Sequence, residues 1–184
     1  KDGNKNRLQE KDIHKIVDVF NNELELSKYS RKVYLDEIAN DKNDYNLNIP
    51  RYIDSQEAED LQDIDAHIFG GIPQRDIEAL DKYWKIFPNL KKDLFEPQRA
   101  GYYDLKIERN QVKNTIFNFT EFVTYKKKLQ TTFENWKADI QTQLEKFKEG
   151  IHPKQEIAKI GESILNTFSK DPLLEGYDMY QHLM

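Results

Sequence analysis

A run of about forty residues without glycine or proline restricts most strongly how this chain can fold. It covers residues 110–149, and glycine and proline are the residues that most readily interrupt a helix. An apolar stripe runs along it, and its later members are spaced by three and four residues: Ile116, Phe119, Val123, Leu129, Phe133, Trp136, Ile140, Leu144 and Phe147. The pattern predicts one long amphipathic helix, or two helices with a break near Thr120. From Val123 to Phe147 such a helix would be roughly 37 Å long.

Shorter segments before and after this run also have recognisable patterns. Residues 9–22 carry apolar side chains at helical spacing and predict a helix that stops at the Asn21 and Asn22 pair. Further helices are predicted at 74–87, 154–169 and 173–183, with Pro73 and Pro172 each opening one. Residues 36–39 predict a single helical turn. An extended arm is predicted at 45–52, because Pro50 disfavours a helical Ile49. The alternation at 101–107 predicts a short strand or hairpin arm.

These elements predict a mainly α protein. We expect a helical bundle with one long amphipathic helix, preceded by an extended or irregular lead-in with one short strand or hairpin. The expected division is a lead-in segment over residues 1–66 and a helical C-terminal domain over residues 67–184. Residue 1 is Lys1 rather than Met, so we expect a piece of a longer protein, with a processed chain as the alternative.

The charge of the chain is unevenly distributed. The net charge is −5, but residues 36–65 hold ten acids against Lys42 and Arg51, which leaves a mildly basic remainder. This balance does not predict a free-standing DNA-binding protein, and we expect weak duplex affinity at most. It is compatible with a subunit that meets DNA only within an assembly. The absence of cysteine and of a long apolar run fits a cytoplasmic protein with no membrane span.

The motifs of catalysis and of cofactor binding are missing from the sequence. The four histidines are scattered, and no cysteine can help them, so no metal site is predicted. The only adjacent glycines, Gly70 and Gly71, precede Ile-Pro rather than a phosphate-binding pattern. Residues 48–52 hold Asn, one Pro and an aromatic, but not in the Asn-Pro-Pro-aromatic spacing of amino-methyltransferases that act on DNA bases. We therefore predict no catalytic, cofactor-binding or metal-binding residue in this chain.

Three consecutive lysines, Lys126, Lys127 and Lys128, are candidates for contacts with a DNA backbone. The simpler interpretation is the solvated back of the long helix. The apolar stripe has two interpretations as well, since it can pack inside this chain or against another subunit. In the second case Trp136, Ile140, Leu144 and Phe147 are the favoured partner contacts.

The sequence also resembles a known family. The segments that carry the resemblance are GNKNRLQEKDIHKIVDVF at 3–20, KYSRKVYLDEIANDKNDYNLNIPRYID at 28–54, DIDAHIFGGIPQRDIEALDKYW at 63–84, FPNLKKDLF at 87–95 and PLLEGYDMYQHLM at 172–184. They are similar to the modification subunit of type I restriction-modification systems, in the region that follows its catalytic domain. The YNLNIPRY element at 45–52 is the most specific of these matches.

The resemblance implies a protein–protein interaction role in DNA methylation. The intact subunit of that family is an adenine-N6 DNA methyltransferase that uses S-adenosylmethionine, and its cofactor and catalytic loops lie upstream of the region seen here. The implied partners are the specificity subunit, which reads the DNA target, and the restriction subunit. This region is then a non-catalytic docking module that packs on the specificity subunit. The alternative is a stand-alone helical adaptor unrelated to DNA modification.

Overall fold

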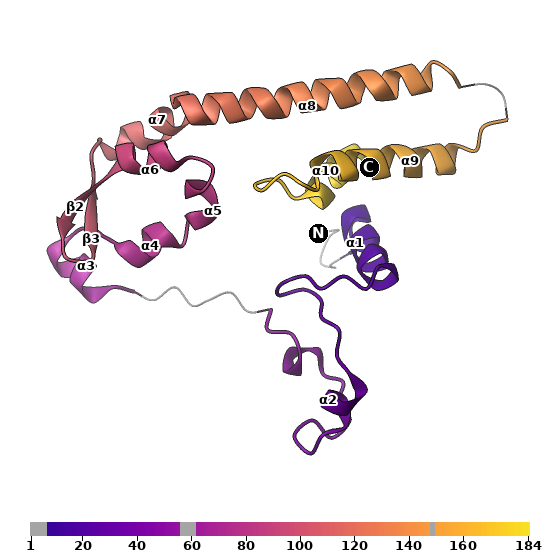
Figure 1. The fold of residues 1–184 in the computed structure, drawn as a ribbon, viewed down its shortest axis with the longest axis horizontal. Coiled ribbons are helices and arrows are strands. Elements are labelled where there is room, and N and C mark those ends of the chain that lie inside the picture. Colours follow the sequence, from indigo (N-terminus) through magenta and orange to yellow (C-terminus); the bar gives the residue numbers. More distant parts are fainter. Residues whose placement is uncertain (1–6, 56–61, 148–149) are drawn as a thin grey trace. The chain divides into compact units, whose positions relative to one another are not determined.

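A computed structural model describes residues 7–55, 62–147 and 150–184 (Figure 1). The chain divides into two compact units. The first comprises Lys1–Asp60 with Tyr180–Met184, and the second comprises Leu61–Met179. The described residues hold ten α-helices and one three-stranded sheet, which confirms the prediction of a mainly α protein.

The first unit begins with helix α1 (Glu10–Asn21), which confirms the predicted helix at 9–22. Its start is fixed by Asp12, whose carboxylate accepts a hydrogen bond from the Gln9 backbone N–H at 2.8 Å. Its end is fixed by Asn22, whose side chain donates to the Asp18 carbonyl at 3.0 Å. A single turn, α2 (Leu35–Ala39), follows as predicted.

The predicted extended arm at 45–52 is wrong in its second half. Ile49–Arg51 form a 3₁₀ turn, η1, in which the Arg51 N–H donates to the Asn48 carbonyl at 3.0 Å. The Tyr52 hydroxyl also donates to the Asn46 carbonyl at 2.5 Å and folds the segment back. Proline fixes only its own φ, at a value that a tight turn accommodates as well as an extended chain does.

Among the described residues of the first unit, Tyr180 alone is buried. None of residues 7–55 is buried. The ring of His14 on α1 stacks on Tyr180 at 4.6 Å, and the Lys11 backbone N–H donates to Gln181 at 3.1 Å. Four apolar side chains on one face of α1 stay exposed: Ile13, Ile16, Val17 and Phe20. Hydrogen bonds and one ring stack therefore account for much of the order in this unit.

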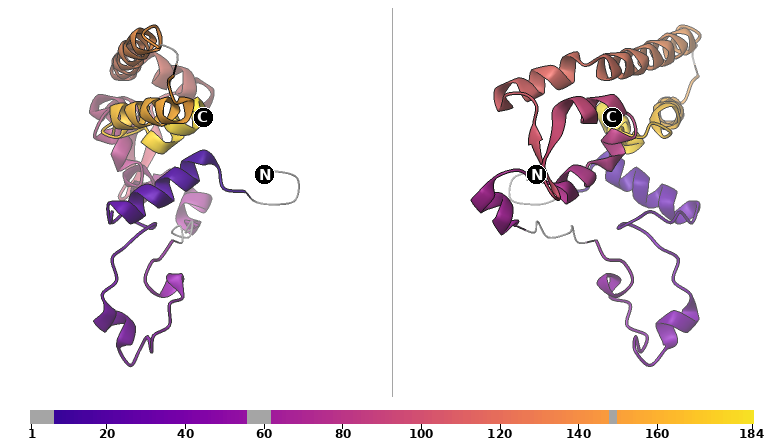
Figure 2. Two further views of the ribbon diagram at one scale, coloured as in Figure 1. Left: turned by 90° about the vertical axis from the view of Figure 1, so that its right-hand side faces the viewer. Right: turned by 60° about the vertical axis from the view of Figure 1, so that its left-hand side comes forward.

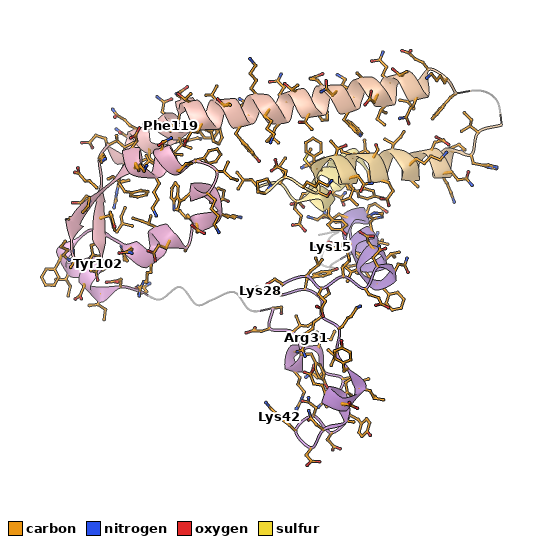
Figure 3. All side chains as sticks on the ribbon, in the orientation of Figure 1. Lys15, Lys28, Arg31, Lys42, Tyr102 and Phe119 are labelled. Carbon is orange, nitrogen blue, oxygen red and sulfur yellow. The ribbon has the colours of Figure 1, made fainter. Side chains whose placement is uncertain are left out.

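The second unit begins with α3 (Ile64–Phe69) and a small antiparallel sheet. Its strands are β1 (Ile72–Pro73), β2 (Phe95–Arg99) and β3 (Tyr102–Leu105), in the order β1-β3-β2. Strand β3 confirms the prediction for 101–107. Asp63 caps α3 by accepting from the Ala66 N–H at 2.9 Å. It also accepts, at 3.0 Å, from the hydroxyl of Tyr102, a residue that Figure 3 labels. The second of these bonds links the start of the helix to strand β3 of the sheet.

The predicted helix at 74–87 is in fact two short helices, α4 (Gln74–Glu78) and α5 (Asp81–Trp84). Pro73 belongs to β1 and only precedes α4. The break occurs because the Ile77 carbonyl accepts from the Leu80 N–H at 3.2 Å and from the Trp84 indole N–H at 2.5 Å. A continuous helix would need that carbonyl for the N–H of residue 81.

The best-packed part of the second unit lies around α6 (Pro88–Leu94). Phe87, Leu90 and Leu94 are buried there. They are covered by half-buried side chains that come from well-separated parts of the chain: Trp84, Ile86, Phe95, Ile107, Ile116, Phe119, Phe122, Tyr125 and Leu173. The ring of Phe87 lies 5.7 Å from Phe122 and 5.5 Å from Tyr125.

The glycine-free run forms two helices, as the sequence allowed. A 3₁₀ turn, η2 (Arg109–Gln111), leads into α7 (Val112–Asn118), and α8 (Thr120–Leu144) follows after a change of direction (Figure 2). The break lies at Phe119, whose backbone is extended at φ −67° and ψ 137°. Helix α8 ends at Leu144, so Phe147 lies beyond it.

Two helices complete the second part of the chain. Helix α9 (Pro153–Phe168) confirms the prediction for 154–169. Helix α10 (Gly176–Leu183) starts four residues after Pro172, so the prediction that Pro172 opens it is wrong. The Asp171 carboxylate accepts from the backbone N–H groups of Leu173 and Leu174 at 3.0 and 3.1 Å. Those bonds keep the segment after Pro172 as a turn.

One side chain of α8 caps the central helix α6. The Glu121 carboxylate accepts from the backbone N–H of Asn89 and of Leu90, each at 3.2 Å, and from the Asn89 amide at 2.7 Å. A negative charge at the first turn of a helix satisfies free N–H groups and favours the helix dipole. We predict that Glu121→Gln lowers the free energy of unfolding by about 1 kcal/mol, measured by urea denaturation.

The matched control for this prediction is Glu134→Gln, at an exposed position of the same helix. It removes the same charge and leaves α6 untouched. An equal decrease in the free energy of unfolding of the two variants would show that the change in net charge, and not the loss of the cap, is responsible.

Tyr125 joins α8 to the turn before α10. Its hydroxyl donates to the Asp171 carboxylate at 2.5 Å. Burial first, and then this hydrogen bond, raise the pKa of Tyr125 well above its usual range. A raised pKa in the folded state contributes stability below the unfolded value of about 10, and this contribution is lost as the pH rises further. We predict that the free energy of unfolding falls above about pH 10, and that Tyr125→Phe flattens this fall.

The control is Tyr83→Phe, which removes a hydroxyl from a more exposed tyrosine of the same unit. Unfolding is followed by urea titration at several alkaline pH values. A decline that is equally steep in the Tyr125→Phe variant would contradict the role given to this hydrogen bond.

Candidate functional site: the α8–α9 hairpin

Helices α8 and α9 form an antiparallel hairpin in the second unit (Figures 1 and 2). Their packing joins Trp136 of α8 to Ser163 of α9, where the indole N–H donates to the hydroxyl at 2.8 Å. Ser163 in turn donates to the Ile160 carbonyl at 2.8 Å. This polar bridge can form at only one position of the two helices along each other, so it fixes their register.

The four predicted partner contacts separate into two pairs in this hairpin. Ile140 is buried, and Trp136 is half-buried with its ring 5.7 Å from that of Phe133. Leu144 and Phe147 are accessible, with exposed fractions of 46% and 40%. The stripe is therefore divided, since its middle packs on α9 and its last two members face solvent.

The accessible pair lies at the end of the hairpin, where the chain turns from α8 towards α9. A shallow cavity of about 300 Å³ is found there, lined by Leu144, Phe147, Ile151, Pro153, Glu156, Ile157 and Ile160. We call this set of residues the hairpin end. Ile157 is 52% exposed, and Glu156 forms an ion pair with Lys159 at 2.6 Å. An apolar hollow with a single charged member suits an apolar side chain of another protein better than a polar substrate.

Ile151 and Ile157 were not among the sequence candidates. Ile157 was recognisable as part of the apolar pattern at 154–169, but periodicity alone does not tell a covered residue from an exposed one. Only the packing of α8 on α9 shows that Ile157 lies beside Leu144 and Phe147.

The three lysines proposed for DNA contacts, Lys126, Lys127 and Lys128, are exposed on α8. The carbonyls of Lys127 and Lys128 accept hydrogen bonds from the Thr131 and Thr132 hydroxyls at 3.0 Å. Nothing in this geometry tests whether their side chains meet a phosphate, so the contact stays a prediction.

In the part of the chain that the structure describes, no group of three histidine, aspartate or glutamate side chains is placed to hold a metal ion. Among the helices of that part, none has the length and apolar character needed to cross a bilayer.

Two comparisons with known proteins gave matches. Residues 1–61 match the model of the N-6 DNA Methylase family. Over 79 residues the chain is 40% identical to a protein of Methanocaldococcus jannaschii named type I restriction enzyme MjaVII methylase subunit. That alignment covers 42% of this chain and 13% of the M. jannaschii protein, so the chain spans only a small part of its relative. No solved structure matches the chain.

The bridge between Trp136 and Ser163 generates a prediction. Trp136→Phe keeps an aromatic ring on α8 but removes the indole donor. We expect the free energy of unfolding to fall by about 1 kcal/mol in urea denaturation. The same change in a Ser163→Ala background serves as the control, because the hydrogen bond is already absent there. A penalty of the same size in both backgrounds would mean that packing, not the hydrogen bond, is lost.

Proposed function

Since this chain is related to the methylase subunits of type I restriction enzymes, we propose that it is a non-catalytic assembly region of such a subunit. In this proposal it packs on the specificity subunit and helps to position the adenine-N6 methyltransferase domain on DNA. The restriction subunit joins the same assembly. The relationship agrees with the resemblance seen in the sequence, while the docking role is our own inference.

The observation that carries the proposal is the hairpin end. Leu144, Phe147 and Ile157 expose apolar surface side by side around one hollow. An apolar patch with a polar rim is typical of a protein-binding surface. A long helix of the specificity subunit could fill such a hollow with one or two large side chains, as in helix-in-groove recognition.

The buried half of the stripe has a supporting role in this proposal. Trp136 and Ile140 hold α8 on α9, so Leu144 and Phe147 are presented in a fixed arrangement. A surface that is already ordered before binding loses less conformational entropy on association. A rigid contact with the specificity subunit would then hold the methyltransferase domain in a defined position on the DNA. Such a region can aid the reaction in this way without touching the substrate.

The chemistry of methyl transfer belongs, in this proposal, to the intact protein. S-adenosylmethionine would be its cofactor, but the adjacent glycines of this chain do not fit a cofactor loop. Gly71 has a φ of +86°, which favours glycine, and a Cβ there would lie 3.2 Å from the Cβ of Tyr102, so this glycine serves a tight turn beside β3. We keep residues 1–66 as the lead-in and 67–184 as the docking domain, and we propose a cytoplasmic protein that meets DNA only within the assembly. There, Lys126, Lys127 and Lys128 are candidates for backbone contacts.

The stand-alone adaptor is not favoured. The match to the N-6 DNA Methylase model covers residues 1–61, and an adaptor unrelated to DNA modification gives no reason for that match. The coding sequence directly upstream would discriminate further, because a methylase subunit predicts an Asn-Pro-Pro-aromatic loop there.

The docking role predicts the effect of two charges placed at the hairpin end. We expect Leu144→Asp/Phe147→Asp to abolish copurification of the chain with its cognate specificity subunit, because two carboxylates would be desolvated in an apolar contact. Both positions are exposed, so helical content by circular dichroism should be unchanged. The measurement is coexpression with a tagged specificity subunit, followed by affinity capture.

The matched control is Val123→Asp, an exposed apolar position near the start of the same helix. This variant should be captured like the unmodified chain. Capture of the double variant at the normal level would contradict the proposed contact, and loss of capture in the control alone would move the contact to the other end of α8.

A further inference from the structure

A second cavity lies in the best-packed part of the chain, between α6 and the sheet. Its volume is about 590 Å³, and its lining residues are Ile77, Pro88, Lys91, Lys92, Phe95, Tyr103 and Lys106. They come from α4, α6, β2, β3 and the residue after β3. We call it the lysine cavity. Its volume lies within the usual range of small-molecule sites.

The lining of the lysine cavity holds three cations and no acid. Strand alternation contributes to this separation. Phe95 and Tyr103 line the cavity, whereas their neighbours Glu96 and Asp104, which pair across β2 and β3, line a different one. Neighbouring side chains on a strand point to opposite faces of the sheet. Glu96 and Asp104 therefore lie on the other face of the sheet from Phe95 and Tyr103, and of the three lysines Lys106 alone borders their cavity as well.

The three ammonium groups lack partners that would neutralise them. Within the described residues none of Lys91, Lys92 and Lys106 forms an ion pair. Their ammonium groups make no other contact with a charged side chain there. Lys106 donates to the Lys92 backbone carbonyl at 2.7 Å, which holds its ammonium group close to α6. Lys91 is half-buried and Lys92 and Lys106 are exposed, so an anion at this cavity would meet three lysine side chains.

The rest of the lining is apolar and partly aromatic. Ile77 is buried, and Phe95 packs edge-on against Trp84 with ring centroids 5.8 Å apart, so the Phe95 ring is held in place. Tyr103 is half-buried, and in the described part of the chain no hydrogen bond engages its hydroxyl. A ligand that fits these groups has an anionic part for the lysines and a flat apolar part for the rings.

We propose that the lysine cavity binds a nucleotide, with the phosphate at the three lysines and the base against Phe95 and Tyr103. The ligand is either a free mononucleotide or one unpaired nucleotide of a single strand, because a paired base cannot leave its stack to enter a cavity without an added cost. The net charge of −5 also disfavours a long duplex. This inference goes beyond the docking role and does not depend on it.

The test uses the whole chain and two probes. AMP is titrated while the backbone amide signals of Tyr103 and Lys106 are followed by NMR, and a fluorescein-labelled short oligothymidylate is titrated by anisotropy at low and high salt. We expect the triple variant Lys91→Gln/Lys92→Gln/Lys106→Gln to weaken binding about tenfold or more. We expect Tyr103→Leu, which keeps apolar contact but loses the ring, to weaken binding while the salt dependence is retained.

The matched control is Lys113→Gln/Lys137→Gln/Lys170→Gln, which removes the same charge from three exposed positions of the same unit. It should bind as the unmodified chain does. Saturable AMP binding at the cavity supports the free nucleotide as the ligand, and oligothymidylate binding without AMP binding supports the single strand. Equal losses in the two triple variants, or no binding of either probe at roughly millimolar concentration, would overturn the proposal. Circular dichroism confirms that each variant is folded.

Discussion

The second unit depends on the burial of α6 beneath the start of the long helix. Phe87, Leu90 and Leu94 cannot be covered by their own neighbours in sequence, and Phe119, Phe122 and Tyr125 supply the missing surface from the α7–α8 junction. Glu121 lies between these aromatic residues and closes the N-terminus of α6. Apolar burial and helix capping thus act on the same contact.

The two units illustrate different ways in which a chain can be ordered. In the second unit, large side chains from distant segments meet in a common core. In the first, backbone turns and side-chain hydrogen bonds shape residues 7–55 without burying any of them. One example is Arg31, which donates to the Tyr52 carbonyl at 3.2 Å and forms an ion pair with Glu37. Exposed polar contacts of this kind contribute little net stability, so we expect the first unit to be the less stable of the two.

Long, regular patterns in the sequence predicted the structure well, whereas short ones did so only in part. The stripe from Ile116 to Leu144 and the pattern around Ile164 gave α7, α8 and α9 because a helix of several turns averages over local exceptions. The breaks at Leu80 and after Pro172 were missed, since each depends on a side chain that competes for a backbone group, Trp84 in one case and Asp171 in the other. In the candidate site, Leu144 and Phe147 were foreseeable from spacing. The exposure of Ile157 and the lysine cavity required the tertiary arrangement.

The exposed face of α1 affects how the chain behaves in concentrated solution. Ile13, Ile16, Val17 and Phe20 form a continuous apolar strip on a helix that has polar groups on its other sides. Salts such as sulfate strengthen the attraction between apolar surfaces by being excluded from them. We therefore expect this strip to lower the solubility of the chain as the concentration of such a salt is raised.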